Sequence, residues 1–224
     1  MAKVSTVPHQ TITKRYTFSN ARDNVRHSTT TTPASNQGIP VTFSITAGGS
    51  GYSASDNVSL TLNTPASGGG TEATGMTITV GGGAVTGVTN PNSNGRGYRT
   101  GDILNVVGGN SDATVTVDAV QYTMGQVPDN AILDTAIIDC TTPFAVASST
   151  GTIAMRIGTG AGAGGGLNKT IKTANHDATP WSGEQFQDDI LSKTVGVHDV
   201  IVLITNKQCT AGDATLFVNY YQGV

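Results

Sequence analysis

Charged and aromatic side chains are scarce in this chain, and neither sign of charge dominates it. Charged residues make up 12% of the 224 residues and aromatic residues 5%, and the formal net charge is −3 at pH 7. This balance provides no general basic field, which excludes non-specific nucleic-acid binding as an expected function. No apolar run of about 18 residues occurs, so the sequence predicts no membrane-spanning helix.

The sequence also lacks the marks of a secreted, disulfide-rich protein. The N-terminal stretch MAKVSTVPHQTITKRY has no apolar secretory segment, which predicts a protein made and kept in a cytoplasm. Only two cysteines occur, Cys140 and Cys209, in or beside expected strands. We expect them to be buried free thiols in a reducing compartment, although a disulfide is possible if their strands are neighbours.

Glycine and threonine are abundant in place of these residues. The chain contains 29 glycines and 35 threonines. Threonine favours pleated, half-buried strands, whereas glycine supplies positive φ at tight turns and weakens helices. The sequence therefore predicts an all-β fold: an antiparallel, jelly-roll-like sandwich plus a small β-domain of two related repeats, with an extended N-terminal arm.

The chain divides into three segments. Residues 1–40 read as the arm and linker, with an alternating stretch at 11–18 and five of the twelve basic residues. Residues 41–120 contain the internal repeat, and residues 121–224 read as the sandwich. If residues 11–45 supply its first strand, the repeat region is an insertion. The expected sandwich strands are AILDTAIIDC at 131–140, TIAMRIG at 152–158, VIVLITN at 200–206 and ATLFVNYY at 214–221.

The repeat is visible as two Gly-Tyr turns, SITAGGSGY at 44–52 and TNPNSNGRGY at 89–98. Superposing Gly51-Tyr52 on Gly97-Tyr98 also aligns Asp56 with Asp102. Two copies are too few for a free-standing solenoid. The pattern predicts a small β-domain built from two three-stranded units.

The sequence offers no anchor for catalysis. No HExxH or CxxC spacing occurs; His176-Asp177 and His198-Asp199 are the best candidates for a metal or acid–base site, but such pairs more often cap strand ends. Ser50 in GGSGY is replaced by Arg96 in the second copy, which argues against a serine nucleophile. We expect a protein that is not an enzyme, with no catalytic, cofactor-binding or metal-binding residues.

Five shorter stretches carry further expectations. GTGAGAGGGLNKT at 158–170 lacks P-loop spacing and reads as a hairpin loop before a β-like stretch, whereas GGNSDATV at 108–115 comes near a calcium-binding repeat but occurs once. PWSGEQFQDDILSK predicts a short helix capped by Ser182. VIVLI at 200–204 and AIID at 136–139 are expected to be buried on both faces or sandwiched between sheets.

Residues 45–109 contain ITAGGSGYSASDNVSLTL, GGGTEATGMTITVGGGAVTGVT and NGRGYRTGDILNVVGG. This text resembles the Gly-Tyr β-repeat of tailed-bacteriophage virion proteins. The C-terminal stretches DNAILDTAIIDCTTPF, TIAMRIGTG and HDVIVLITNKQCTAGDATLFVNYYQGV resemble, more loosely, sandwich domains of phage head-decoration (cement) proteins and of some fibre proteins. Homotrimers are common among such proteins, which is what the resemblance implies for this chain.

The resemblance implies a virion structural protein on the capsid surface, assembled in the host bacterial cytoplasm. The expected function is capsid decoration, with the major capsid protein and other copies of the chain as partners and with no cofactor. The alternative is a tail or fibre component that binds host surface glycan or another tail protein. Aromatic and arginine residues are the usual interface anchors, although the repeat tyrosines could instead plug the ends of the small β-domain. The candidate interface residues are Arg15, Tyr16, Arg22, Arg26, Tyr52, Arg96, Tyr98 and Arg99.

Overall fold

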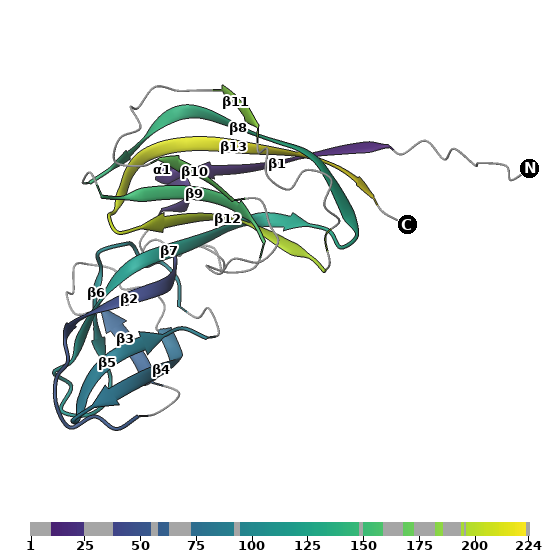
Figure 1. Ribbon diagram of the computed structural model, residues 1–224. Helices are drawn as coiled ribbons and strands as arrows, with labels where there is room; N and C mark the ends of the chain where they lie inside the picture. Colours follow the sequence, from purple (N-terminus) through teal and green to yellow (C-terminus); the bar gives the residue numbers. More distant parts are fainter. Residues whose placement is uncertain are drawn as a thin grey trace, which may run out of the picture.

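The computed structural model is nearly all β. It describes residues 10–24, 38–54, 58–62, 73–91, 95–147, 150–158, 168–172, 182–185, 194 and 196–222. Within this part the chain forms thirteen strands and one four-residue helix, α1 (Asn20–Asp23). Figure 1 shows two bodies, a curved sandwich and a smaller β-barrel attached at one side. The expected all-β, sandwich-like class is confirmed.

The first sheet of the sandwich has four antiparallel strands in the order β1-β13-β8-β11. Their bounds are Thr11–Ser19, Cys209–Gln222, Ala131–Val146 and Ser182–Gln185. β1 pairs with β13 from Thr11↔Tyr221 to Ser19↔Asp213. Residues 11–19 are therefore an edge strand of the sandwich, not part of a free arm, and the repeat region follows them as an insertion.

The second sheet of the sandwich is formed by β10, β9, β12 and β7, in that order. Their bounds are Asn168–Lys172, Thr152–Ile157, His198–Thr205 and Thr114–Val127. All of VIVLI in β12 is buried, as expected for a strand covered on both faces. AIID in β8 fits the alternative of a stretch sandwiched between sheets on one face only: Ala136 and Ile138 are buried, whereas Ile137 and Asp139 on the outer side of β8 are half-buried.

The two sheets pack through aromatic rings that lie against glycines. Phe18 of β1 meets Tyr122 of β7 edge-on, with ring centroids 5.4 Å apart. The ring of Tyr16 lies over Gly125, where an added Cβ would be 2.9 Å from the nearest ring carbon. Close approach of ring to backbone thus requires a glycine at that position of β7.

The barrel consists of β2 (Ile39–Ala47), β3 (Val58–Leu62), β4 (Ala73–Gly81), β5 (Ala84–Thr89), β6 (Ile103–Val106) and the first half of β7. Its strands pair in the order β5-β4-β3-β6-β7-β2. The loop after β2 meets the start of β5, because Val85 N–H donates to the carbonyl of Gly48 at 2.7 Å. This contact brings the two ends of the strand series together around an apolar interior.

The two repeats are intertwined in this barrel. We call β2, β3 and β4 unit 1, and β5, β6 and β7 unit 2. The central strands β3 and β6 pair with each other, at Leu60↔Val106 and Leu62↔Leu104. The first strand of each unit pairs with the third strand of the other, β2 with β7 and β5 with β4. The pairing therefore has the form of a two-fold exchange, with β3 and β6 beside its axis.

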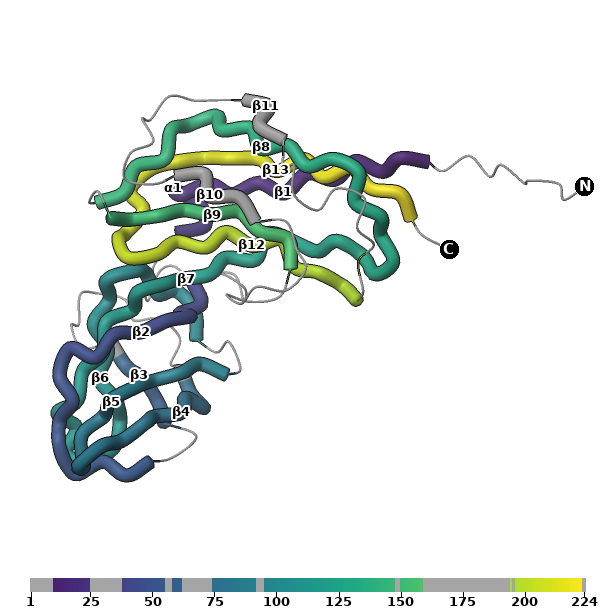
Figure 2. The backbone as a smooth tube through the Cα atoms, in the orientation of Figure 1, coloured from purple at the N-terminus to yellow at the C-terminus, as the bar shows by residue number. Residues whose placement is uncertain are grey.

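β7 belongs to both bodies. Its first half pairs with β6 and β2, and its second half pairs with β12 from Ala119↔Thr205 to Val127↔His198. Figure 2 shows the tube of β7 running from the barrel into the sandwich. The expected boundary at residues 120 and 121 therefore falls inside a continuous strand.

The segment after Ser182 differs from its prediction. Residues 182–185 form β11, which pairs with β8 at Ser182↔Asp139, instead of opening a capped helix. The rest of that predicted helix, 186–193, lies outside the described residues. The β-like stretch expected after the glycine loop is confirmed as β10, which pairs with β9.

Candidate functional site

The first Gly-Tyr turn lies at the end of the barrel away from the sandwich, and its polar groups bond to one another. The N–H and the hydroxyl of Ser50 donate to the two carboxylate oxygens of Asp112, at 2.8 and 2.9 Å. These hydrogen bonds hold the pKa of Asp112 below its ordinary value. Asn110 Nδ2 donates to Ser50 Oγ at 3.0 Å. Ser50 is thus a turn-forming residue, and Asp112 of the near-calcium motif is engaged in the same turn.

The tyrosine of this turn is buried and closes one end of the barrel interior, a role that we call an aromatic plug. Tyr52 is 5% exposed, and its hydroxyl donates to the carbonyl of Val106 at 3.0 Å and accepts from the N–H of Ala113 at 3.1 Å. Gly109 has a φ of 52°, and a Cβ there would be 2.7 Å from the ring. The glycines of the turn therefore make room for the tyrosine ring.

The second turn repeats this arrangement. Tyr98 is 1% exposed, and its N–H donates to the carbonyl of Gly38 at 3.0 Å, just before β2. Tyr52 N–H donates in the same way to the carbonyl of Gly83 at 2.9 Å, just before β5. The two turns are structurally equivalent, and both tyrosines are interior residues.

The second turn also bonds to the sandwich. Thr100, 5% exposed, donates its hydroxyl to the carbonyl of Ile204 in β12 at 3.3 Å. Arg99 Nη2 donates to the carbonyl of Asn24, just after α1, at 2.9 Å. The side chain of Asp102 accepts from Arg99 N–H at 2.9 Å and fixes the turn. One copy of the repeat thus joins the barrel to the sandwich, while the other forms the free end.

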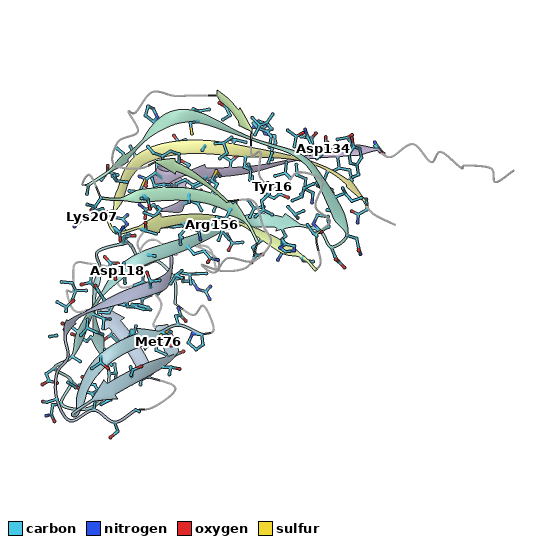
Figure 3. The ribbon with its side chains drawn as sticks, viewed as in Figure 1. Tyr16, Met76, Asp118, Asp134, Arg156 and Lys207 are labelled. Atoms are coloured by element: carbon cyan, nitrogen blue, oxygen red, sulfur yellow. The ribbon has the colours of Figure 1, made fainter. Side chains whose placement is uncertain are left out.

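A pocket opens beside the first Gly-Tyr turn (residues 44–52), which we call the free Gly-Tyr turn. It has a volume of about 400 Å³. Gly51, Tyr52, Ser53, Val58 and Val107 contribute to its walls, and Val107 is 48% exposed. Figure 3 shows side chains throughout this body, with Met76 labelled; that residue is fully buried in the barrel interior. The pocket is open to solvent and borders the core, since Tyr52, Val58 and Ile78 in its walls are buried core residues.

The arginines expected as interface anchors lie in different environments. Arg15 is exposed on β1, with its guanidinium 5.5 Å from the ring centroid of Phe217. The side chain of Arg22 is 59% exposed and forms an ion pair with Asp23 at 2.7 Å. Arg96 is half-buried. Arg26 lies outside the described residues.

The eight candidate residues do not form one surface. Tyr16, Tyr52 and Tyr98 are buried and are not surface anchors, and Tyr16 donates its hydroxyl to the carbonyl of Gln126 at 2.8 Å. Burial raises the pKa of Tyr16 to about 12. Arg99 faces the contact between the barrel and the sandwich, which we call the junction. Its guanidinium donates there to the carbonyl of Asn24. Among the seven candidates in the described part, Arg15 and Arg22 are the exposed side chains.

Sequence reasoning missed two residues that connect the barrel to the sandwich, Asn24 and Thr100. Asn24 sits in the polar stretch ARDNVRH, and its partners are far away in the chain. Thr100 is one of 35 threonines. Nothing in their local sequence distinguishes these residues from exposed polar ones.

Of the two candidate His-Asp pairs, His198-Asp199 lies at the start of β12. Asp199 accepts a hydrogen bond from Gln126 Nε2 at 2.9 Å, while the neighbouring His198 is half-buried with its Nδ1 unbonded. His176 and Asp177 lie outside the described residues. No cluster of three metal-ligating side chains occurs among the residues that the structure describes. No helix in that part is long and apolar enough to cross a membrane.

Both cysteines are buried free thiols, as predicted. Cys140 pairs with Ala214, and Cys209 pairs with Val146, so the two are separated along the β8–β13 ladder. Burial raises the pKa of Cys209 to about 12. Two such thiols are unreactive as long as the sandwich is folded.

We therefore expect no rapid reaction of the native protein with an aromatic disulfide reagent at pH 8, and two reactive thiols after unfolding in guanidinium. The released thiolate, measured by absorbance, gives the count. A thiol that reacts rapidly in the native protein would contradict the burial of Cys140 and Cys209.

In comparisons with known proteins, no family model, no curated protein and no solved structure matches the chain.

Proposed function

We propose that this protein is a structural component of a tailed-bacteriophage virion, and specifically a capsid decoration (cement) protein that binds the head lattice and stabilises it. The observation that carries the proposal is the use of both Gly-Tyr turns for architecture. Tyr52 and Tyr98 are buried, and the hydroxyl of Ser50 is bonded to Asp112. A repeat that keeps a turn and an aromatic plug suits a rigid body that presents surfaces to partners.

The outer strand faces support the same proposal. They carry polar side chains that bond across neighbouring strands, which limits the loss of entropy on contact and keeps the chain soluble before assembly. The pairs are Thr13–Asn219, Thr17–Thr215, Ser44–Asp118 and Thr46–Thr116.

The mechanism of such a protein is burial of interface area at many equivalent lattice positions. Its partners are the major capsid protein and copies of itself, as a homotrimer with closed symmetry. Arg15 and Arg22 are the exposed arginines of the candidate set that remain available to such contacts. β1 pairs with β13 within the chain and lies at an edge of its sheet.

The test is reconstitution of expanded capsids that lack this protein. We expect the purified protein to bind them and to raise the temperature at which they release DNA or lose their shell in calorimetry. Quantitative mass spectrometry of intact virions should find hundreds of copies per particle. A few tens of copies or fewer, or no binding to capsids, would reject decoration.

A tail or fibre component is the second candidate, and the pocket beside Tyr52 is the observation that favours it. An open pocket of about 400 Å³ with mixed polar and apolar walls suits a sugar or a small side chain. Binding to host cells in place of capsids, lost when Ser53→Trp fills the pocket, would select this function.

A further inference from the structure

The junction between barrel and sandwich contains an unusual number of buried polar side chains. Asp23, Asn24, Thr100 and Asp102 are each no more than 5% exposed. Burying such groups is costly unless each is hydrogen-bonded. A satisfied buried network stabilises one arrangement against others, because any shift leaves a donor or acceptor without a partner.

Asn24 is the centre of this network. Its Nδ2 donates to the Oδ1 of Asn20 and to the carbonyl of Cys209, both at 2.9 Å. Its Oδ1 accepts from the hydroxyl of Tyr122 at 2.7 Å, and its carbonyl accepts from Arg99 Nη2 at 2.9 Å. One residue therefore joins α1, the start of β13, the shared strand β7 and the second Gly-Tyr turn.

The groups around Asn24 are themselves held in place by packing and hydrogen bonds. Tyr122 is 1% exposed, is packed edge-on against Phe18, and has its pKa raised above the ordinary value by burial. Asp23 accepts from the N–H of Ser19 at 2.8 Å and from both ends of the Arg22 fork at 2.7 Å. The helix α1, which Asn24 follows directly, is thus held at the end of β1.

The covalent link that the structure describes between the bodies is β7. Residues 119–121 of this strand pair with β2 on one side and with β12 on the other. Twisting of β7 at this point is opposed by bonds that cross the junction. They are Arg99 to Asn24, Thr100 to Ile204, and the N–H of Asn206 to the carbonyl of Asp118 at 2.7 Å.

We infer that Asn24 is a positioning residue that latches the barrel at one fixed angle to the sandwich. This goes beyond the proposed function, because the latch operates whichever partner the protein binds. The barrel then acts as a rigid projection that holds the free Gly-Tyr turn at a set distance and direction from the sandwich. Loss of the latch frees the barrel to tilt about residues 119–121 of β7.

The test measures the distance between one spin label on each body, by double electron–electron resonance. A change in the angle between the bodies changes this distance. Thr79→Cys on β4 and Thr141→Cys on β8 place labels at exposed sites, while the buried native thiols stay unlabelled. We expect a single narrow distance distribution in this background. Asn24→Ala removes the side-chain bonds to Asn20, Cys209 and Tyr122 that hold in place the backbone carbonyl accepting from Arg99. It should therefore broaden the distribution or split it into two peaks, at a temperature where circular dichroism still shows native strand content.

Two further variants keep the test decisive. Asn219→Ala removes a hydrogen bond of an asparagine on the outer face of the sandwich, the one with Thr13 at 2.6 Å, and should leave the distribution unchanged. Thr100→Val removes the bond to Ile204 with little change in shape and should broaden the distribution even if Asn24→Ala does not fold. The inference is overturned if the distribution stays narrow in folded Asn24→Ala, or in Thr100→Val when Asn24→Ala does not fold.

Discussion

Replacement of Gly212 by alanine should destabilise the protein by about 3–5 kcal/mol, because it combines backbone strain with overpacking of the core. Gly212 lies in β13 with φ of 134°, a conformation that residues with a side chain rarely adopt. An added Cβ would also overlap the ring of Phe144, which is 4% exposed and stacks on Phe18. Urea denaturation followed by circular dichroism measures the change in free energy of unfolding.

Gly196→Ala is the matched control for Gly212→Ala. Gly196 also has a positive φ, 83°, but no atom lies within 4 Å of a Cβ placed there. Its destabilisation should be limited to the strain, about 1–2 kcal/mol. Equal losses in the two variants would mean that the ring of Phe144 moves aside without cost.

Truncation of Tyr52 to alanine should have a comparable effect, a loss of about 3–5 kcal/mol. The side chain closes the free end of the barrel, where its ring is packed between glycines and its hydroxyl joins Val106 to Ala113. Hydrogen exchange should show the largest loss of protection in β2, β5 and β6, since these strands or their loops contact the turn. Thermal unfolding and exchange mass spectrometry measure the two effects.

Tyr52→Phe separates the ring from its hydroxyl. It keeps the packing but leaves the N–H of Ala113 and the carbonyl of Val106 without that partner, so we expect a loss of about 1–3 kcal/mol. If phenylalanine proved as damaging as alanine, the hydrogen bonds and not the plug would hold the turn. An alanine variant with native stability would contradict the architectural role of the turn.

Local pattern predicted most strands of the sandwich and the doubled turn of the barrel. Alternation in TITKRYTF became β1, and the apolar run VIVLI became a strand buried on both faces, because burial in a sheet has a simple signature in sequence. In AIID the same signature did not distinguish the two faces: Ala136 and Ile138 are buried, but Ile137 lies on the outer face beside Phe217. An apolar residue at an outward position cannot be told from a core residue by pattern alone.

Long-range partnerships were beyond prediction. Asn24 bonds to Arg99, Tyr122 and Cys209, which are 75, 98 and 185 residues away. Nothing in ARDNVRH specifies such contacts. The helix expected after Ser182 failed for the same kind of reason, because pairing of β11 with the edge of β8 overrides a local capping pattern.

The exchange of strands in the barrel has a consequence for the order in which the chain can acquire structure during synthesis. Unit 1 emerges from the ribosome first, but its strand β2 has its partner in β7, the last strand of unit 2. Neither unit can therefore complete its strand pairing alone. Folding of the barrel must wait until residues 114–121 have been synthesised and are free to pair. Because the same strand goes on to pair with β12, the barrel is completed only as the centre of the sandwich begins to form.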